Sequence, residues 1–475
     1  MISAGGLFSF LLSLRGGGKT GADMKIIIAG DGKIGETLTR QLSAEGHDLT
    51  LIDSDPEVLK STVDRYDVLS VNGNCASLQT LRDAEVEKAD LLITAANEDE
   101  VNLLSCLTAH GLNPRLHTIA RIRNPEYLEQ VYSMQELFAL SLSINPEQQA
   151  AREIEQLIQY PGFLRRETFA NGRVEIVELR VEEGSRLCSV ALSSLSSVVH
   201  CQVLVCAVLR DGSAAAPDGS FVLRAGDRIF VTADTGNLTL LLKNLGITTH
   251  RAGRVMIAGG GRISYYLASR LLASGIEVRL IEQDPRTAQR LALQLPKACV
   301  VEGDVSIQEL LESEGLTHMD AFVSLTGIDE LNMIISLYAA SRRVPQVITK
   351  LGRPENLRMT DRLHLGSVVC PRELCASTIV RYVRAMQNQV GAAKSMHYIA
   401  DGQAEAMEFI VDRSTPHCGE PLRKLKLRRN VLLACITHEA RTEIPNGDSV
   451  FSAGDTLVVV TNGDTLIRRL NDIFE

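Results

Sequence analysis

The chain has no tryptophan, and aromatic side chains make up only 4% of its 475 residues. Proteins that bind single-stranded nucleic acid stack bases on aromatic side chains, and proteins that bind duplexes cluster lysine and arginine. Here 58 acidic residues outnumber 49 basic ones, and the formal net charge is −9. Both shortages argue against a nucleic-acid-binding protein.

Paired cysteine motifs and long apolar runs are missing as well. None of the ten cysteines forms a C-x-x-C pair, so the sequence indicates neither a structural zinc site nor a thioredoxin-like redox site. Scattered thiols are typical of proteins in the reducing cytosol. No apolar run approaches the roughly 18–20 residues that span a bilayer. We therefore expect a soluble cytoplasmic protein without a metal site, which can still dock onto a membrane protein.

The first 23 residues differ in character from the rest. Their apolar run, Leu7–Leu14, has no basic residue before it, as a secretory signal would require. Gly18-Lys19-Thr20 resembles the end of a phosphate loop, but Ser13 stands where that motif needs glycine. A strand begins directly after Met24. We expect residues 1–23 to be a disordered extension or a misassigned start.

An internal repeat organises the remaining chain. The segment that begins at residue 25, KIIIAGDGKIG, returns at residue 254 as RVMIAGGGRIS, so that Gly259 corresponds to Gly30, 229 residues earlier. Glu282 corresponds to Asp53 with the same spacing, and Gly454 corresponds to Gly226 with a spacing of 228. The chain from about residue 24 is therefore a tandem duplication of two similar halves.

Each half combines two kinds of pattern. Short apolar runs at 25–29, 48–52, 68–71, 90–95 and 116–121 alternate with helical patterns such as Gly35–Glu45. This order predicts an α/β fold, a doubly wound, Rossmann-like parallel sheet with helices on both faces. The strict alternation over Val174–Glu182 predicts a small α+β module. The expected parts are 24–145 and 252–372 for the Rossmann-like domains, 146–164 and 373–394 for crossover helices or linkers, and 165–246 and 395–475 for the small modules.

A glycine loop follows the first strand and opens the first helix. Gly30 permits a tight turn, Gly32 lets the backbone approach a pyrophosphate, and Gly35 allows the helix to pack closely on the strand. The helix N-terminus offers free N–H groups to the phosphates. Asp53, at the tip of the second strand, can accept hydrogen bonds from both ribose hydroxyls and repel a 2′-phosphate. The alternative is a turn of glycines that binds no ligand.

The second copy departs from this motif. Ser264 replaces the third glycine, and Glu282 carries one methylene more than Asp53. A retained fold with a weak or empty pocket is the alternative for this copy. Arg121 and Lys350 end equivalent later strands, at the sheet edge where ligands bind. Each is either a cation that neutralises phosphate charge or a surface cation.

Catalytic patterns are missing from the small modules. They carry no recurring His, Cys or Lys constellation, which a dehydrogenase would need beside its cofactor fold. Two cofactor folds, each joined to a small module, suit sensing better than hydride transfer. The basic stretch 423–429 is most simply a solvated face, with docking to a partner or anionic lipid as the minor alternative.

Several of these segments together resemble one known family. The TrkA proteins of potassium-uptake systems consist of tandem RCK domains, each a KTN (TrkA-N) part followed by a TrkA-C part. The resemblance runs from Met24 to the C-terminus. It is carried by the stretches at 24–35, 51–54, 119–127, 144–147 and 255–263.

The resemblance implies a cytosolic regulatory subunit, not an enzyme, that lies at the inner face of the cell membrane. The family assembles as a ring of RCK domains, here expected to be a tetramer of tandem chains, and gates a TrkH-type membrane protein in response to a nucleotide. NAD(H) is the expected ligand, with ATP or ADP left open. The alternative functions are an NAD-dependent oxidoreductase acting on an unidentified small substrate and a soluble ligand sensor for another transporter.

The resemblance also implies two sets of nucleotide contacts, each with a glycine loop, an acidic residue, the loop after the fourth strand and a cation. Whether the second site is occupied stays open. The first set, with the rest of its loop, is Gly30, Asp31, Gly32, Lys33, Ile34, Gly35, Asp53, Ala96, Asn97 and Arg121. The second set is Gly259, Gly260, Gly261, Arg262, Ile263, Glu282, Thr326 and Lys350.

Overall fold

The computed structural model describes residues 24–475 apart from 134–136, 160–161, 248–251, 354–355, 357–362, 364, 387–392, 440, 463–466 and 468. The chain divides into two compact units, the first ending at Ile144 and the second beginning at Asn145. The expectation for residues 1–23 lies outside the described residues. Within the described part of the chain, no helix is long and apolar enough to cross a membrane.

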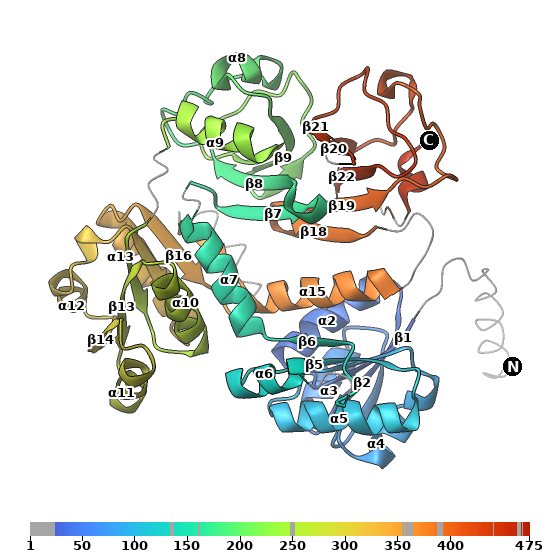
Figure 1. Ribbon diagram of the computed structural model, residues 1–475, viewed down its shortest axis with the longest axis vertical. Helices are drawn as coiled ribbons and strands as arrows, with labels where there is room; N and C mark the ends of the chain where they lie inside the picture. The colour runs from blue at the N-terminus through green and yellow to red at the C-terminus, as the bar shows by residue number, and fades with distance from the viewer. Residues whose placement is uncertain are drawn as a thin grey trace, which may run out of the picture. The chain divides into compact units, whose positions relative to one another are not determined.

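The first unit is a parallel sheet with the strand order β3-β2-β1-β4-β5-β6 (Figure 1). This confirms the expected doubly wound fold. Because β1 pairs with both β2 and β4, the strand order changes direction at β1, and ligands of doubly wound sheets bind at the ends of the strands beside such a point. The elements are β1 (Lys25–Ala29), α2 (Lys33–Ala44), β2 (Asp48–Asp53), α3 (Pro56–Val63), β3 (Leu69–Asn72), α4 (Leu78–Asp83), β4 (Leu91–Thr94), α5 (Asp99–Leu112), β5 (His117–Arg121), α6 (Pro125–Ser133) and β6 (Leu142–Ile144).

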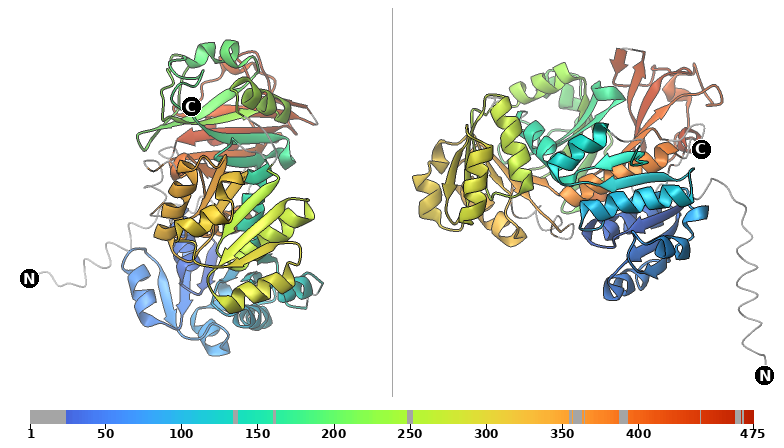
Figure 2. Two further views of the ribbon diagram at one scale, coloured as in Figure 1. Left: turned by 90° about the vertical axis from the view of Figure 1, so that its left-hand side faces the viewer. Right: turned by 60° about the horizontal axis from the view of Figure 1, so that its bottom comes forward.

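The second unit contains a second parallel sheet with the equivalent order, β14-β13-β12-β15-β16-β17, and helices on both faces (Figure 2). Its central strands are buried because helices cover both sides, as their continuous apolar runs predict. The elements are β12 (Arg254–Ala258), α10 (Arg262–Ala273), β13 (Glu277–Glu282), α11 (Pro285–Gln294), β14 (Cys299–Glu302), α12 (Gln308–Ser313), β15 (Ala321–Ser324), α13 (Asp329–Ser341), β16 (Gln346–Lys350) and β17 (Ser367–Val369).

Helix α7 (Pro146–Gln159) comes from the first half of the sequence but packs on α10 of the second half (Figure 1). Its buried Ala150 and Ala151 let the two helices approach closely, and they share one core with Leu267 of α10. At the edge of this contact, Arg270 Nε donates to Glu155 Oε2 at 2.5 Å. The helix that begins at the second glycine loop is therefore held by a helix from the other half.

Two antiparallel sheets complete the second unit, with the orders β10-β9-β11-β8-β7 and β18-β19-β22-β20-β21. They share one apolar core, to which the first sheet contributes Ile176 and Ala207 and the second Ala406 and Val458. The first module has β7 (Arg165–Phe169), β8 (Val174–Arg180), α8 (Leu195–Val199), β9 (Leu204–Arg210), β10 (Ser213–Ala215), β11 (Arg228–Ala233) and α9 (Thr235–Asn244). Helix α15 (Pro371–Met386) leads into the second, with β18 (Ser395–Ile399), β19 (Ala404–Ile410), β20 (Val431–His438), β21 (Arg441–Glu443) and β22 (Thr456–Asn462).

An ion pair joins the two modules at equivalent positions, the third residues of β7 and β18. The carboxylate of Glu167 contacts His397 Nδ1, and Arg165 Nε donates to the same carboxylate at 2.8 Å. Burial alone would raise the pKa of Glu167, but the charges of Arg165 and His397 outweigh it and lower the pKa to about 2. The folded state therefore favours ionised Glu167, so this group stabilises the two modules above its unfolded pKa and ceases to do so as the pH falls toward 2.

We expect Glu167→Gln to destabilise this pair of modules at pH 7, by up to about 3 kcal/mol for a shift of this size. The difference from the wild type should narrow as the pH falls below about 4.5, where the unfolded carboxyl takes up its proton. Thermal unfolding followed between pH 7 and pH 3 tests this. Glu183→Gln, at an exposed carboxyl of the same module, is the control; a pH-independent loss in Glu167→Gln would contradict the prediction.

Candidate functional site

The first glycine loop requires glycine where the sequence predicts it. Gly30 has φ +96°, and a Cβ there would lie 2.6 Å from the backbone nitrogen of Ala96 in the loop after β4. A Cβ on Gly35 would lie 2.1 Å from the carbonyl oxygen of Gly30. The loop after β1, the start of α2 and the loop after β4 are therefore in backbone contact, which a larger side chain would prevent.

Gly32 differs from these two because it faces open space. It is the N-cap of α2, with the extended angles φ −70° and ψ −167°, and an added Cβ would meet no heavy atom within 4 Å. No side chain caps the helix there. Lys33 is exposed beside it, whereas Ile34 is buried and anchors the turn. Uncapped N–H groups, the positive end of the helix dipole and a nearby cation together suit a phosphate group.

The carboxylate of Asp53 is clamped by the backbone at the end of β2. Its Oδ2 accepts from the backbone nitrogen of Asp31 at 2.7 Å, and its Oδ1 accepts from that of Asp55 at 2.9 Å. Each oxygen keeps a second lone pair, and the side chain is half-buried. The arrangement holds an acceptor beside the glycine loop, as recognition of ribose hydroxyls requires.

Asp31, whose backbone nitrogen donates to Asp53, brings a second carboxyl to this part of the site. Its side chain is only 2% exposed. Burial raises the pKa of Asp31 to about 6, and the negative charges of Asp53 and Glu36 add to this effect, while the hydroxyl of Thr62 opposes it. Sequence reasoning placed Asp31 in the loop but did not foresee this buried carboxyl.

The loop after β4 is held by an amide and a cation. The side chain of Asn102 accepts from the backbone nitrogen of Ala96 at 2.9 Å and donates to the carbonyl oxygens of Ala96 and Arg121. Arg121 Nη2 donates to the Ala96 carbonyl at 2.6 Å, and Arg123 donates to the carbonyl of Asn97. Arg121 is therefore tied to the loop after β4.

The second glycine loop repeats this geometry with small changes. Gly259 has φ +102°, and its added Cβ would lie 3.0 Å from Leu325 backbone atoms. Ser264 is accommodated because its buried hydroxyl donates to the Gly259 carbonyl at 2.5 Å. Gly261, the N-cap of α10, again faces open space. Arg262 is exposed and Ile263 half-buried, so the features suited to a phosphate are present here too.

The backbone clamp, in which two backbone N–H groups hold the carboxylate, is also repeated in the second copy. Glu282 accepts from the backbone nitrogens of Gly260 at 2.5 Å and Asp284 at 2.8 Å. A Cβ on Gly260 would lie 2.7 Å from Leu291 Cδ1 and 2.9 Å from Glu282 Cγ. The longer acid and a leucine thus fill the space that the Asp31 carboxyl takes in the first copy.

Lys350 acts in the second copy as Arg121 does in the first. Its Nζ donates to the carbonyl oxygen of Thr326 at 2.5 Å, and the amide of Asn332 bonds both the backbone of Thr326 and the carbonyl of Lys350. Sequence reasoning did not assign a role to Asn102 or Asn332. Their recurrence in the repeat, next to Asp-Glu at 99–100 and 329–330, was the available signal.

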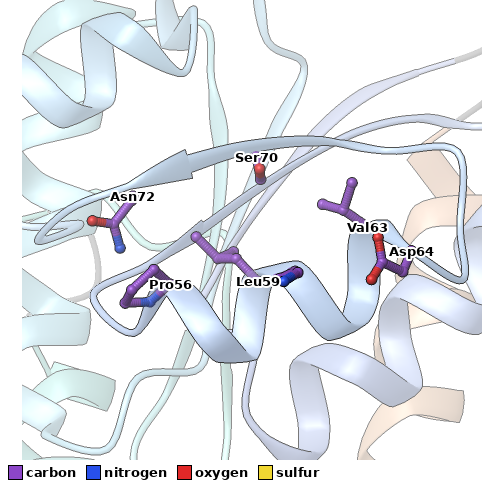
Figure 3. Close-up of a pocket in the computed structure, with 7 residues that line it drawn as sticks. Pro56, Leu59, Val63, Asp64, Ser70 and Asn72 are labelled. Atoms are coloured by element: carbon purple, nitrogen blue, oxygen red, sulfur yellow. The ribbon is translucent and has the colours of Figure 1, made fainter.

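A pocket of about 290 Å³ lies beside the first site, between α3 and β3. Figure 3 shows Pro56 and Asn72 toward one end and Val63 and Asp64 toward the other. The side chain of Asn72 donates to the backbone carbonyl of Asp53 at 3.0 Å. The end of the pocket at Asn72 therefore adjoins Asp53. None of the predicted contacts lines this pocket.

We expect Asp31→Asn to stabilise the first unit at pH 8. A carboxyl whose pKa is raised by folding destabilises the ionised protein, here by up to about 3 kcal/mol, and the penalty disappears as the pH falls through 6 toward 4. Thermal unfolding between pH 8 and pH 4 checks this, with the exposed Asp64→Asn as control. An equal effect at both ends of the range would contradict the prediction.

Both kinds of domain match known families. Residues 26–139 and 255–371 match the TrkA-N domain, and residues 176–246 and 406–474 match the TrkA-C domain. The Trk system potassium uptake protein TrkA of Haemophilus influenzae is 30% identical over 95% of this chain and 99% of its own length. The TrkA homolog of Archaeoglobus fulgidus is 31% identical over 95% of this chain and 100% of its own length.

Solved structures share the fold. The GsuK RCK domain aligns over 96% of this chain and 97% of its own, with a TM-score of 0.58 and 17% identity. The GsuK channel bound to NAD aligns over 97% of this chain and 82% of its own, with a TM-score of 0.57 and 18% identity. At these identities the likeness establishes the arrangement of the elements.

Proposed function

The chain belongs to the family of Trk system potassium uptake proteins TrkA, and from this premise we propose that it is the nucleotide-binding regulatory subunit of a Trk-type potassium uptake system. It acts in the cytoplasm at the inner face of the membrane and gates a TrkH-type subunit. The chains assemble as a ring of RCK domains, a tetramer of tandem chains. The resemblance to this family supports these assignments.

NAD(H) is the proposed ligand, and ATP and ADP are the alternatives. The observation that carries this assignment is the open, uncapped N-terminus of α2 at Gly32, beside the backbone-clamped carboxylate of Asp53. The phosphates bind at the helix N-terminus and the ribose hydroxyls donate to the carboxylate. A neighbour with the same fold is a channel bound to NAD. We assign no catalytic residue.

The second site has a physical route to the rest of its unit. A nucleotide at Gly261 sits on the N-terminus of α10, the helix that packs against α7. Beyond residue 159, the chain from α7 leads to β7 of the first antiparallel module. A ligand shifts such an assembly only if it binds one arrangement more tightly than the other. We propose that nucleotide binding at the second site favours one arrangement of α10 against α7, and that α7 passes this change to the first antiparallel module.

Substituting Gly32→Asp and Gly261→Asp separates binding from folding. Aspartate is a favoured N-cap residue and fits the extended angles at both positions, but its carboxylate occupies and repels the phosphate position. Each variant should lose one of the two binding events that titration calorimetry with NADH detects, and the double variant both. Melting temperatures should stay near that of the wild type.

The control is Gly111→Asp in α5, where an added Cβ also meets no atom within 4 Å. It introduces the same charge away from the glycine loop and should bind like the wild type. Unchanged binding in the double variant would rule out the proposed sites. An absorbance screen at 340 nm with small hydroxy and oxo compounds tests the oxidoreductase alternative, for which we expect no turnover.

Replacing Asp53→Ala and Glu282→Ala together should blunt nucleotide control of potassium flux. Loss of hydrogen bonds to a charged acceptor weakens ribose recognition by roughly 10- to 100-fold. The measurement is potassium flux into vesicles that hold the TrkH-type partner, with and without NADH, NAD, ATP and ADP. Glu183→Ala, at an exposed carboxyl of the first antiparallel module, is the control. Full regulation of flux by the double variant would overturn the proposed mechanism.

A further inference from the structure

The two copies differ in the side chains that lie next to the carboxylate proposed to bind the ribose. In the first copy, the space next to this carboxylate, called the slot below, holds the side chain of Asp31. Asp31 is 2% exposed and adjoins Asp53, whose carboxylate is held by backbone N–H groups. In the second copy the same position is Gly260, and Glu282 and Leu291 close the slot. The slot of the first site therefore contains a titratable group, Asp31, whereas that of the second site is closed in part by the apolar side chain of Leu291. Both copies keep the backbone clamp, so this difference is separate from how the carboxylate is held.

We propose that Asp31 couples nucleotide binding at the first site to the uptake of a proton, so that the affinity of this site varies with pH and that of the second site does not. The proposal rests on the proposed function, because it concerns a nucleotide at the first glycine loop. It adds a difference between the sites that neither the motif nor the family comparison contains.

The charged groups that shift the pKa of Asp31 are both carboxylates, and Lys33, two residues further along the loop, is exposed. Asp53 faces Asp31 from β2, Glu36 lies on α2, and Thr62 of α3 is the polar side chain beside Asp31. Glu36 is itself paired with Arg65 at 2.8 Å, so its charge is partly offset. Burial and the charge of Asp53 both disfavour ionised Asp31, and a proton on Asp31 relieves both penalties.

A nucleotide makes that proton more favourable. Its phosphates would approach at Gly32, the residue next to Asp31, and add negative charge within a few ångströms. Anionic ligand and proton therefore favour each other, as linkage requires. The pKa of Asp31, already raised to about 6 by burial, rises further on binding. The affinity of the first site should consequently increase as the pH falls.

The experiment isolates each site with the N-cap variants. In the Gly261→Asp background, NADH binding to the first site should tighten about fivefold from pH 8 to pH 6 if binding raises the pKa by one unit. Calorimetry in two buffers of different ionisation enthalpy should show proton uptake. In the Gly32→Asp background, the second site should show neither effect, and it controls for protons taken up by the nucleotide itself.

Two variants at position 31 complete the test in the Gly261→Asp background. Asp31→Asn keeps the shape, and Asp31→Gly copies the second site; both should bind with a flat pH profile and no proton uptake. Glu36→Gln removes a charge from α2 and should keep a pH-dependent affinity, shifted to slightly lower pH because the charge of Glu36 adds to the raised pKa of Asp31. A profile that survives Asp31→Asn and Asp31→Gly overturns the inference alone. Failure of the Gly261→Asp protein to bind NADH at any pH overturns the proposed first site together with the inference.

Discussion

The close passage of the loop after β1 over the loop after β4 is the contact on which the candidate site depends. A Cβ on Gly30 would lie 2.6 Å from Ala96, so only glycine permits the approach. The approach sets where α2 begins, and hence where its free N–H groups point. It also brings the Ala96 carbonyl to Arg121 and Asn102, which tie the next strand to the same place.

The two copies show how this geometry tolerates change when substitutions compensate. Glu282 reaches further than Asp53 by one methylene, and its Cγ would be 2.9 Å from a Cβ at position 260. Only glycine at position 260 therefore leaves room for the longer side chain of Glu282. The shorter Asp53 leaves a slot in which Asp31 fits. The backbone clamp on the carboxylate is the same in both copies, so the constraint acts on total volume and not on each residue separately.

Local patterns predicted much of the fold and part of the site. Short apolar runs and glycine spacing located β1 and α2 nearly to the residue because their periodicity and φ requirements are local. The short β6 was not predicted, since three residues carry too little periodicity. The role of Asn102 was missed because its partners lie 6 and 19 positions away. The contact of α7 with α10 joins the two halves, and no local pattern encodes it.

Tandem duplication frees equivalent positions to become different, and the second unit shows why this matters. The third residues of β7 and β18, Glu167 and His397, contact each other. In an assembly of two identical halves, a residue at this position would meet its own copy, and a carboxylate would then face a carboxylate. A single chain that carries both halves can place a histidine opposite an acid. The same freedom lets an acid stand behind one glycine loop and an apolar side chain behind the other. Two nucleotide sites with one geometry can thereby respond to different conditions.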